Sequence, residues 1–581
     1  MNASLPPSAS RRAIRTSALR GLTGVWRRAT ATPGPAGVAP WVGWLGLGLW
    51  LAVAGNTVLW SALWALPEVS GARGLVFMAA FALALGGVLL ALLAVLAVLG
   101  GHWGWRVGGT VLLACAAAAT PFMSRYGVVV DASMLTNVLK TDVREAADLM
   151  SPSLLLHLLV LGVAPAVVLW RVRWRPLVGA SRWVRAPLLA VGGLAVALLL
   201  MAGFYADLAS VMRNHKSVRY QINPLNTVYA AARLAVHHTP RAQRPLQAVG
   251  TDARLGPTHA ASPQAPLLVL VVGETARAAN FSLGGYARDT NPELSAIAHQ
   301  GHLLWMGNAQ SCGTNTEASV PCMFSALGKA GHEAADAPHE NLLDVLQRAG
   351  LGVVWLDNQS GCKGVCDRVP NINTREGDDP VLCPGGECLD ARLLQALPEQ
   401  IAALPPERRA RGVVAVLHQM GNHGPAYHKR SPADRKPFQP ECTSNALQDC
   451  PREHLVNAYD NAIRYTDHVL ASTIRWLQTQ SADTALLYVS DHGESLGEGG
   501  FYLHGLPYAI APQEQTHVPW VTWVSPALQA RLSLDMGCLK GRSAQRISHD
   551  HLFHTVLGLV DVQTEVHRSA LDLIAPCLKN K

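Results

Sequence analysis

Long apolar runs fill the first third of the chain. They cover residues 41–64, 75–100, 106–122, 153–170 and 186–206. Each approaches the roughly 20 residues that a helix needs to cross the hydrocarbon core of a bilayer. The third run is short and rich in alanine, so the pattern by itself allows four spans or five. We predict a transmembrane domain of five helices over residues 39–207.

Shorter apolar runs after residue 265 are typical of buried strands. They read PLLVLVV at 266–272, GVVWLD at 352–357, GVVAVLH at 412–418 and ALLYVS at 485–490, with helical stretches between them. This alternation predicts an α/β domain with a largely parallel sheet over residues 266–581. Residues 239–265 are rich in Pro and Ala and lack periodicity, so we expect a linker there. It would complete a bridging segment over residues 208–265.

Arginine placement predicts how the apolar helices are oriented. One cluster precedes the first run and another follows the fourth: Arg11, Arg12, Arg15, Arg20, Arg27 and Arg28, then Arg171, Arg173, Arg175, Arg182 and Arg185. The positive-inside rule makes both clusters cytoplasmic, which the five-span count satisfies. The C-terminal domain then lies outside the cytoplasm. A cleaved signal peptide is the alternative for the first run, but its length and distant charged start favour a retained anchor.

Composition supports a membrane protein and gives no sign of nucleic-acid binding. Of the 581 residues, 49% are hydrophobic and 15% are charged, which is too apolar for two ordinary soluble domains. The net charge of +8 would suit an acidic partner, but the arginine clusters beside the membrane account for it. The Arg-, Ala- and Pro-rich tail over residues 1–38 is expected to be disordered and cytoplasmic.

Cysteine placement agrees with an external C-terminal domain. Cys115 lies in the third apolar run, and the other ten cysteines all follow residue 310. An even number in an exported domain indicates disulfides, whereas a cytosolic domain would use them for metal binding. Sequence does not fix the connectivity, but neighbouring cysteines suggest pairs: Cys312 and Cys322, Cys362 and Cys366, Cys383 and Cys388, Cys442 and Cys450, and Cys538 and Cys577.

Acidic and histidine residues follow three of the four predicted strands. Because ligands of parallel sheets bind at the carboxyl ends of strands, we expect these side chains to lie together. A lone Asp-His pair is more often a surface turn, but several such groups favour a metal site. Oxygen and nitrogen donors without a free thiolate suit Zn²⁺ or a related divalent ion. The residues are Glu274, His418, His423, Asp491 and His492, with His504 on the glycine-rich loop beyond.

The loop SCGTNTEASVPC at 311–322 holds several hydroxyl groups, on Ser311, Thr314, Thr316 and Ser319. Taken alone, it is a stapled turn made of ordinary turn residues. A metal ion nearby would lower the pKa of one hydroxyl and make it a nucleophile. Such a site fits phosphoryl or sulfuryl transfer better than acyl transfer, because the chain lacks a GxSxG elbow, and it also lacks a P-loop. The residues alone do not choose among the hydroxyls.

Seven motifs in chain order resemble the phosphoethanolamine transferases that modify lipid A, which are sulfatase-like members of the alkaline phosphatase superfamily. They are VVGETARAANFSLGGY, SCGTNTEASVPCMFS, DNQSGCKGVCDRVP, GNHGPAYHKR, NAYDNAIRYTD, SDHGESLGEGGFYLHG and SHDHLFHTVLGLVDV. The similarity covers nearly the whole chain after the arginine-rich tail. It implies a multi-pass protein of the bacterial inner membrane, with a zinc-dependent catalytic domain over residues 266–581 in the periplasm.

The resemblance also assigns roles within the site. Thr316 would accept the phosphoethanolamine group, while His423 and His504 would line the site and bind substrate, a second metal or the leaving group. His418 would lie behind the ligands or pack at the strand end. One zinc ion would be firmly bound by Glu274, Thr316, Asp491 and His492. Whether a second ion binds is left open.

Two more segments resemble the contacts that the family makes with the lipid headgroup. Asn137, Thr141 and Glu145 recur every four residues, so a single helix would place them on one face. Without the resemblance, the polar side of an interfacial helix would be the simpler interpretation. Ser360 and Lys363 match the other half of the pocket, where a lysine suits an anionic phosphodiester, although a lone lysine on a loop is usually only solvated.

The implied reaction moves phosphoethanolamine from phosphatidylethanolamine to a lipid A phosphate through a phosphoethanolamine-threonine intermediate. The added amine would mask negative charge and give resistance to polymyxin and other cationic peptides. Transfer to a core-oligosaccharide sugar of lipopolysaccharide is the alternative. Glycerol-phosphate transfer, as in lipoteichoic acid synthases, and a membrane-anchored metal sensor without catalysis are weaker rivals. We expect a monomer.

Overall fold

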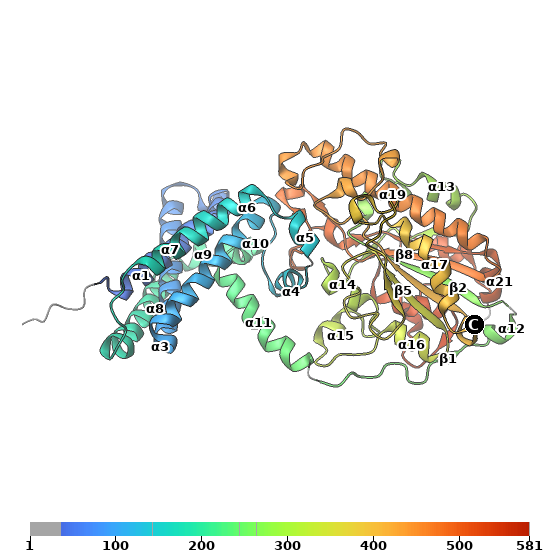
Figure 1. Ribbon diagram of the computed structural model, residues 1–581, viewed down its shortest axis with the longest axis horizontal. Helices are drawn as coiled ribbons and strands as arrows, with labels where there is room; N and C mark the ends of the chain where they lie inside the picture. Colours follow the sequence, from blue (N-terminus) through green and yellow to red (C-terminus); the bar gives the residue numbers. More distant parts are fainter. Residues whose placement is uncertain (1–36, 142, 243, 263, 580–581) are drawn as a thin grey trace, which may run out of the picture.

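The computed structural model describes residues 37–579 apart from residues 142, 243 and 263. Figure 1 shows a region of helices, coloured blue to green, beside a larger α/β domain. The tail predicted over residues 1–38 lies outside the described residues, except for Gly37 and Val38.

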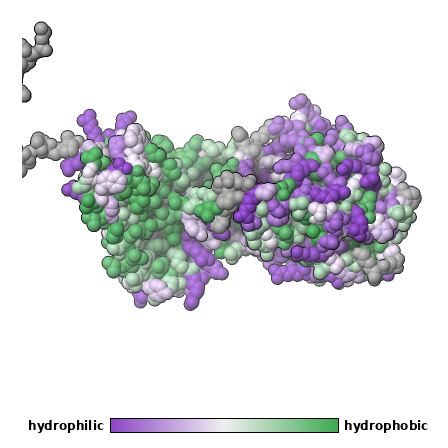
Figure 2. Space-filling model, turned by 90° about the horizontal axis from the view of Figure 1, so that it is seen from below, coloured by the Kyte–Doolittle hydropathy of each residue, from purple (hydrophilic) through white to green (hydrophobic). Residues whose placement is uncertain are grey.

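Four helices among the described residues are long and apolar enough to cross a membrane. They cover Pro40–Trp64, Gly71–Tyr126, Pro152–Arg171 and Ser181–Gly203. The first joins α1 (Pro40–Val53) to α2 (Thr57–Trp64), and the last ends in α8 (Ala186–Gly203). Figure 2 shows hydrophobic surface gathered over this region and hydrophilic surface over the α/β domain. Surface of this kind is suited to contact with lipid.

The second of these helices, α3 (Gly71–Tyr126), combines two predicted apolar runs and folds back at Gly101. Gly101 has a φ of +61°, which glycine adopts at little cost. A Cβ built on Gly109 would lie 3.6 Å from Leu93 Cδ2, whereas a straight helix would separate these residues by about 24 Å. All five predicted runs are therefore helical, and the number of membrane crossings stays a prediction.

Three helices lead from the last apolar helix toward the α/β domain: α9 (Tyr205–Asn214), α10 (Lys216–Tyr220) and α11 (Leu225–Ala242). Asn223, between α10 and α11, is buried among the apolar helices. Its Nδ2 lies 3.1 Å from the carbonyl oxygens of both Gly55 and Ala116, and its N–H donates to Asn56 Oδ1 at 2.8 Å. Because buried polar groups without partners are costly, these bonds fix the start of α11 against the bundle.

The segment at 239–265, where composition predicted a linker, packs against the α/β domain along part of its length. Its first residues complete α11, and Val249 is buried against the α/β domain, where Arg348 Nη1 donates to the Val249 carbonyl at 2.7 Å. Farther on, β1 (Arg254–Leu255) pairs with β14 (Val562–Gln563). Figure 1 shows this segment running along the domain surface. Composition does not reveal these contacts, because they depend on single residues and not on a periodic pattern.

Seven strands of the described chain form the central sheet, in the order β3-β12-β8-β2-β7-β5-β6. The five strands from β8 to β6 are parallel to one another, and β12 is antiparallel to both of its neighbours. This arrangement confirms the largely parallel sheet, and the four predicted strands are β2, β5, β7 and β8. The strands are β2 (Pro266–Gly273), β3 (Leu303–Trp305), β5 (Gly352–Asp357), β6 (Asn371–Asn373), β7 (Val413–His418), β8 (Asp483–Ser490) and β12 (Trp520–Val524).

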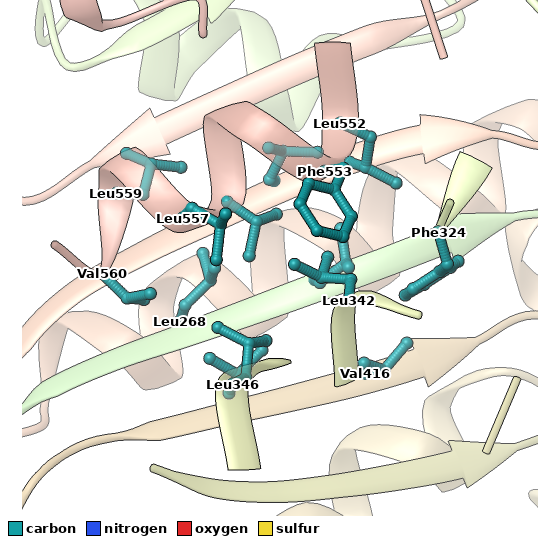
Figure 3. Packing of buried hydrophobic residues seen from close by; sticks show 14 of the residues in the cluster. Leu268, Phe324, Leu342, Leu346, Val416, Leu552, Phe553, Leu557, Leu559 and Val560 are labelled. Carbon is teal, nitrogen blue, oxygen red and sulfur yellow. The ribbon is translucent and has the colours of Figure 1, made fainter. Parts of the chain in front are cut away.

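Helices cover both faces of the sheet, so its central strands are buried throughout. In β2, Leu268 and Leu270 face one hydrophobic cluster while Leu267 and Val269 face the other. Figure 3 shows the first cluster, where side chains of two helices gather over β2 and β7. That face carries α14 (Thr316–Met323), α16 (Leu342–Arg348) and α23 (Asp550–Leu559), and the opposite face carries α13 (Pro292–Ala298), α17 (Ala391–Ala403) and α19 (Arg452–Gln478).

Five disulfides join the ten cysteines that follow residue 310, and Cys115 in α3 is free. The pairing of sequence neighbours is confirmed: Cys312 with Cys322, Cys362 with Cys366, Cys383 with Cys388, Cys442 with Cys450, and Cys538 with Cys577.

Candidate active site at the carboxyl edge of the sheet

Three adjacent strands end at one edge of the sheet and bring the predicted residues together there. The register pairs Gly273 of β2 with Ser490 of β8, so the residues that follow, Glu274 and Asp491, are neighbours. On the other side of β2, His418 ends β7 opposite Val272. The expectation that strand ends gather these side chains is confirmed.

The loop of hydroxyls directs one of them into this edge. Thr316 begins α14, where its Oγ1 lies 3.1 Å from both carboxylate oxygens of Glu274 and 3.5 Å from His492 Nε2. The hydroxyl of Thr314 instead donates to the Leu506 carbonyl at 2.6 Å.

The remaining hydroxyls of the loop are used within it. Ser311 Oγ donates to the Gly313 carbonyl at 2.5 Å, and Ser319 Oγ accepts from the Gly313 N–H at 3.0 Å. Asn315 caps α14, because its Oδ1 accepts from the Ala318 N–H at 2.9 Å. Geometry therefore separates Thr316 from its neighbours, which the sequence pattern could not do.

Glu274, Asp491 and His492 form a cluster without solvent exposure. His492 Nε2 lies 3.3 Å from Glu274 Oε1 and 3.4 Å from Asp491 Oδ2. His492 Nδ1 lies 2.9 Å from the Gly493 carbonyl and donates to it. A neutral imidazole then turns the lone pair of Nε2 toward two carboxylates. Asp491 Oδ2 has no hydrogen-bond partner among the described residues. Buried donors with lone pairs turned toward a common point suit a divalent cation.

Burial and mutual charge shift the pKa values of this cluster. Burial opposes ionisation of Glu274, but the hydrogen bond and charge of His492 hold the pKa of that carboxyl well below its usual range. Burial raises the pKa of Asp491 to about 7, and the charge of Glu274 adds to the rise. Burial would lower the pKa of His492, but Asp491 and Glu274 outweigh it and raise the value to about 9. The carboxylates thus require a positive charge, from a proton on His492 or from a metal ion.

Residues outside the predicted set hold the cluster in place. Gln359, just beyond β5, donates from Nε2 to Glu274 Oε2 at 3.1 Å. The Thr275 N–H donates to Asp491 Oδ1 at 3.1 Å. Gly421 has a φ of +52°, and a Cβ there would lie 2.6 Å from the Glu274 carbonyl oxygen, so the backbone approach requires glycine. Gln359 would have been predicted if the search for polar residues after strands had included amide side chains.

Two predicted histidines form a row with His492. The ring centres of His492 and His504 are 4.4 Å apart, and those of His504 and His423 are 5.5 Å apart. His504 Nδ1 lies 2.8 Å from Glu494 Oε2, and the other oxygen of this buried carboxyl accepts from the Tyr427 hydroxyl. Burial raises the pKa of Glu494 to about 8. Glu494, which sequence reasoning missed, therefore orients His504.

His418 lies behind the cluster, as expected for a strand-end residue. Its Nδ1 is 3.0 Å from Asp357 Oδ2, and its Nε2 is 4.0 Å from Glu274 Oε2.

On the neighbouring loop, Lys363 Nζ donates to Ser360 Oγ at 2.8 Å, and Ser360 Oγ donates to Gln359 Oε1 at 2.6 Å. The structure thus links Ser360 and Lys363 to Glu274 through Gln359.

The helix α4 (Ala132–Lys140) packs against α14, which carries Thr316. Ser133 Oγ accepts from Asn315 Nδ2 at 2.9 Å, and Lys140 forms an ion pair with Glu317. This contact places Asn137 and Thr141 on an element that borders the nucleophile loop.

The prediction that Asn137, Thr141 and Glu145 share one helix face is wrong. The helix ends at Lys140, because Thr141 has an extended backbone and its hydroxyl donates to the Asn137 carbonyl at 2.8 Å. Glu145 belongs to the next helix, α5 (Val143–Asp148), and its side chain lies outside the described residues.

Comparisons with known proteins agree with this architecture. The family model for phosphoethanolamine transferase EptA/EptB matches residues 88–239, and the sulfatase model matches residues 266–562. Phosphoethanolamine transferase EptA of Salmonella typhimurium is 41% identical over 483 residues, covering 82% of this chain and 86% of that protein. Phosphatidylethanolamine transferase Mcr-1 of Escherichia coli is 38% identical over 466 residues, covering 78% of this chain and 83% of that protein.

A solved structure has the same arrangement over almost its whole length. The integral membrane protein lipooligosaccharide phosphoethanolamine transferase A from Neisseria meningitidis matches with a TM-score of 0.86 and 35% identity, covering 92% of this chain and 98% of that one. Apolar helices followed by a sulfatase-like α/β domain, with these identities across most of the chain, show that the protein belongs to the phosphoethanolamine transferase family of the alkaline phosphatase superfamily.

Proposed function

We propose that this protein transfers phosphoethanolamine from phosphatidylethanolamine to a phosphate group of lipid A, through a phosphoethanolamine-threonine intermediate. The observation that carries the proposal is the position of Thr316 Oγ1, 3.1 Å from both oxygens of the buried Glu274. Membership of the family supports the reaction class. The loop holds this hydroxyl alone against the acidic cluster, where a nucleophile would be activated.

A zinc ion fits the cluster and would be held by Glu274, Thr316, Asp491 and His492. Three observations support this donor set. The cluster has two buried carboxylates, and His492 Nδ1 is bound to the Gly493 carbonyl, which leaves Nε2 for the ion. Asp491 Oδ2 has no hydrogen-bond partner among the described residues. When bound, the ion would lower the pKa of the Thr316 hydroxyl and offset negative charge on the phosphoryl oxygens. We propose one firmly held ion, with His423 and His504 beside it as the place for a second.

In the first step, Thr316 Oγ1 attacks the phosphorus of phosphatidylethanolamine and loses its proton. The bond from phosphorus to the diacylglycerol oxygen breaks, and diacylglycerol leaves after gaining a proton. His504, whose Nδ1 lies 2.8 Å from Glu494 Oε2, would assist this proton transfer. The N-terminus of α14 favours the phosphate charge at Thr316. We assign binding of the ethanolamine phosphate headgroup to Asn137, Thr141, Glu145, Ser360 and Lys363, together with His423 and His504.

In the second step, a phosphate oxygen of lipid A attacks the phosphorus of the Thr316 adduct. The bond to Thr316 Oγ1 breaks, and the hydroxyl regains a proton. The product carries a protonated amine, which masks negative charge at the outer surface. Binding of polymyxin and other cationic peptides should weaken for that reason.

The protein is an integral membrane protein, and its described residues include four apolar helices long enough to span a bilayer. We propose that residues 39–207 cross the bacterial inner membrane five times and that residues 208–265 connect them to the catalytic domain. Residues 266–581 would form that domain in the periplasm, and the protein would be a monomer. The arginine clusters and the five disulfides support this topology. Donor and acceptor lipids then share the leaflet that faces the catalytic domain.

The proposal is tested with purified full-length protein, phosphatidylethanolamine and lipid A, with the product measured by mass spectrometry. Wild type should add one phosphoethanolamine group to a lipid A phosphate, and Thr316→Ala should add none. Thr314→Val is the matched control, because the Thr314 hydroxyl is bound to Leu506, and it should stay active. Full modification by Thr316→Ala would contradict the proposal. Modification of a core sugar in intact lipopolysaccharide would favour the alternative acceptor.

A further inference from the structure

A cavity of about 340 Å³ lies beside the nucleophile loop, apart from the acidic cluster. Ser311 and Cys312 of the loop form one wall, and Tyr508, four residues after His504, forms another. The Tyr508 hydroxyl donates to the Ser311 carbonyl at 3.0 Å, which ties the two walls together. The cavity and the proposed active site therefore share two segments of chain.

Two cations line this cavity without a carboxylate bound to either. Lys329 Nζ is buried and has no hydrogen-bond partner among the described residues, and it lies 2.7 Å from the centre of the Tyr508 ring. Burial lowers the pKa of Lys329 to about 8, so the amine is still mostly protonated at neutral pH. Arg546 lines the same cavity with an exposed side chain, and it makes no hydrogen bond or ion pair with the rest of the described chain.

Nearby carboxylates offset these charges only in part, because the charges of Glu333 and Asp550 raise the pKa of Lys329 by less than burial lowers it. Asp550 is the one carboxylate among the described lining residues, and its Oδ1 already accepts from the Lys329 N–H at 2.7 Å. His549 uses both ring nitrogens, since Nδ1 accepts from the Cys312 N–H and Nε2 donates to the Ser490 carbonyl. The cavity thus offers strong donors in excess of acceptors, which suits an anion.

We propose that this cavity binds a phosphorylated sugar, the anionic headgroup of the acceptor lipid. Lys329 and Arg546 would meet the phosphate with charge-assisted hydrogen bonds, and the Tyr508 ring offers a flat apolar face to the sugar. A volume of about 340 Å³ is within the range of small-molecule sites. That this ligand is the acceptor lipid rests on the proposed function. That the cavity binds a sugar phosphate does not depend on it.

The first test is direct binding to the full-length protein in detergent, measured by calorimetry with glucosamine 6-phosphate, inorganic phosphate and glucosamine. The sugar phosphate should bind, phosphate should bind more weakly, and the neutral sugar should not bind. Arg546→Gln and Lys329→Gln should each weaken binding by about tenfold. Lys540→Gln removes an exposed lysine outside the cavity and should change nothing. No binding by wild type, equal binding by the cavity variants, or equal affinity for bare phosphate would overturn the proposal.

The second test measures transfer kinetics. Arg546→Gln should raise the KM for lipid A by about tenfold, with kcat and formation of the Thr316 adduct from phosphatidylethanolamine unchanged. The exposed position of Arg546 keeps this variant informative even if Lys329→Gln folds poorly. An unchanged KM in an enzyme that forms the adduct would overturn this inference alone. Absence of the adduct in wild type would instead overturn the proposed function.

Discussion

Acidification should destabilise the fold through one buried imidazole, that of His549. This residue precedes α23 and is not exposed to solvent. Its Nδ1 accepts from the Cys312 N–H at 3.0 Å, and its Nε2 donates to the Ser490 carbonyl at 2.9 Å. A neutral imidazole satisfies both bonds, whereas a protonated one would turn a donor toward the Cys312 N–H. His549 thereby joins the nucleophile loop to the residue before Asp491.

The size of the effect follows from the pKa shift. Burial lowers the pKa of His549 to about 4, against about 6.5 in an unfolded chain. Between these two values the unfolded chain binds a proton that the folded protein does not, so the free energy of unfolding falls as pH falls. Above about pH 6.5 the neutral imidazole makes its full contribution to the free energy of unfolding. A shift of about 2.5 pKa units corresponds to about 3 kcal/mol, lost as pH approaches 4.

The assay is urea unfolding of the full-length protein in detergent, followed by tryptophan fluorescence at about pH 7.5 and about pH 4.5. Wild type should lose about 2.5 kcal/mol more than His549→Gln across this interval, because the variant has no imidazole to protonate. Other buried groups contribute equally to both proteins and cancel in the comparison. His299→Gln removes an exposed imidazole and should keep the wild-type pH dependence. Equal pH dependence in wild type and His549→Gln would refute the reasoning.

Three further outcomes are expected. Asp491→Asn should lower the zinc content measured by mass spectrometry, because it removes one of the charged groups proposed to hold the ion, and unchanged metal content would contradict the donor set. Replacing Cys312 and Cys322 by serine should cost about 3 kcal/mol in urea unfolding, the value for a loop of this length, and a loss near zero would show that the ring does not order the chain. Lys140→Gln should change stability by less than about 1 kcal/mol, because the lysine of its pair with Glu317 is half exposed, and a larger loss would make this pair the main anchor of α4.

The parts of the fold that sequence predicted are those where burial alone dictates the residue types. The strands β2, β5, β7 and β8 lie at the centre of the sheet and are buried on both faces, so they read as continuous apolar runs. The edge strand β3 is only three residues long and leaves no such run. The break between the apolar runs at 75–100 and 106–122 was predicted, and the structure places it at Gly101, where the approach of Gly109 to Leu93 shows that the chain turns back.

The site was predictable where its residues follow strands and carry charge. Glu274 and Asp491 obey that rule, while Gln359 obeys it without a charge and was missed. His549 left no local signal, because its partner Cys312 lies 237 positions away in the chain. The resemblance singled out Asn137, Thr141 and Glu145, and helical spacing placed them on one face, but the helix ends at Lys140 and Thr141 has an extended backbone.

The central claim is that Thr316 carries the phosphoethanolamine group between donor and acceptor. Its direct test is to incubate the purified protein with phosphatidylethanolamine alone and to examine the peptide over residues 311–322 by mass spectrometry. The account predicts one phosphoethanolamine group on Thr316, which disappears when lipid A is added. An unmodified Thr316 in protein that still modifies lipid A, or an adduct on another residue, would contradict it.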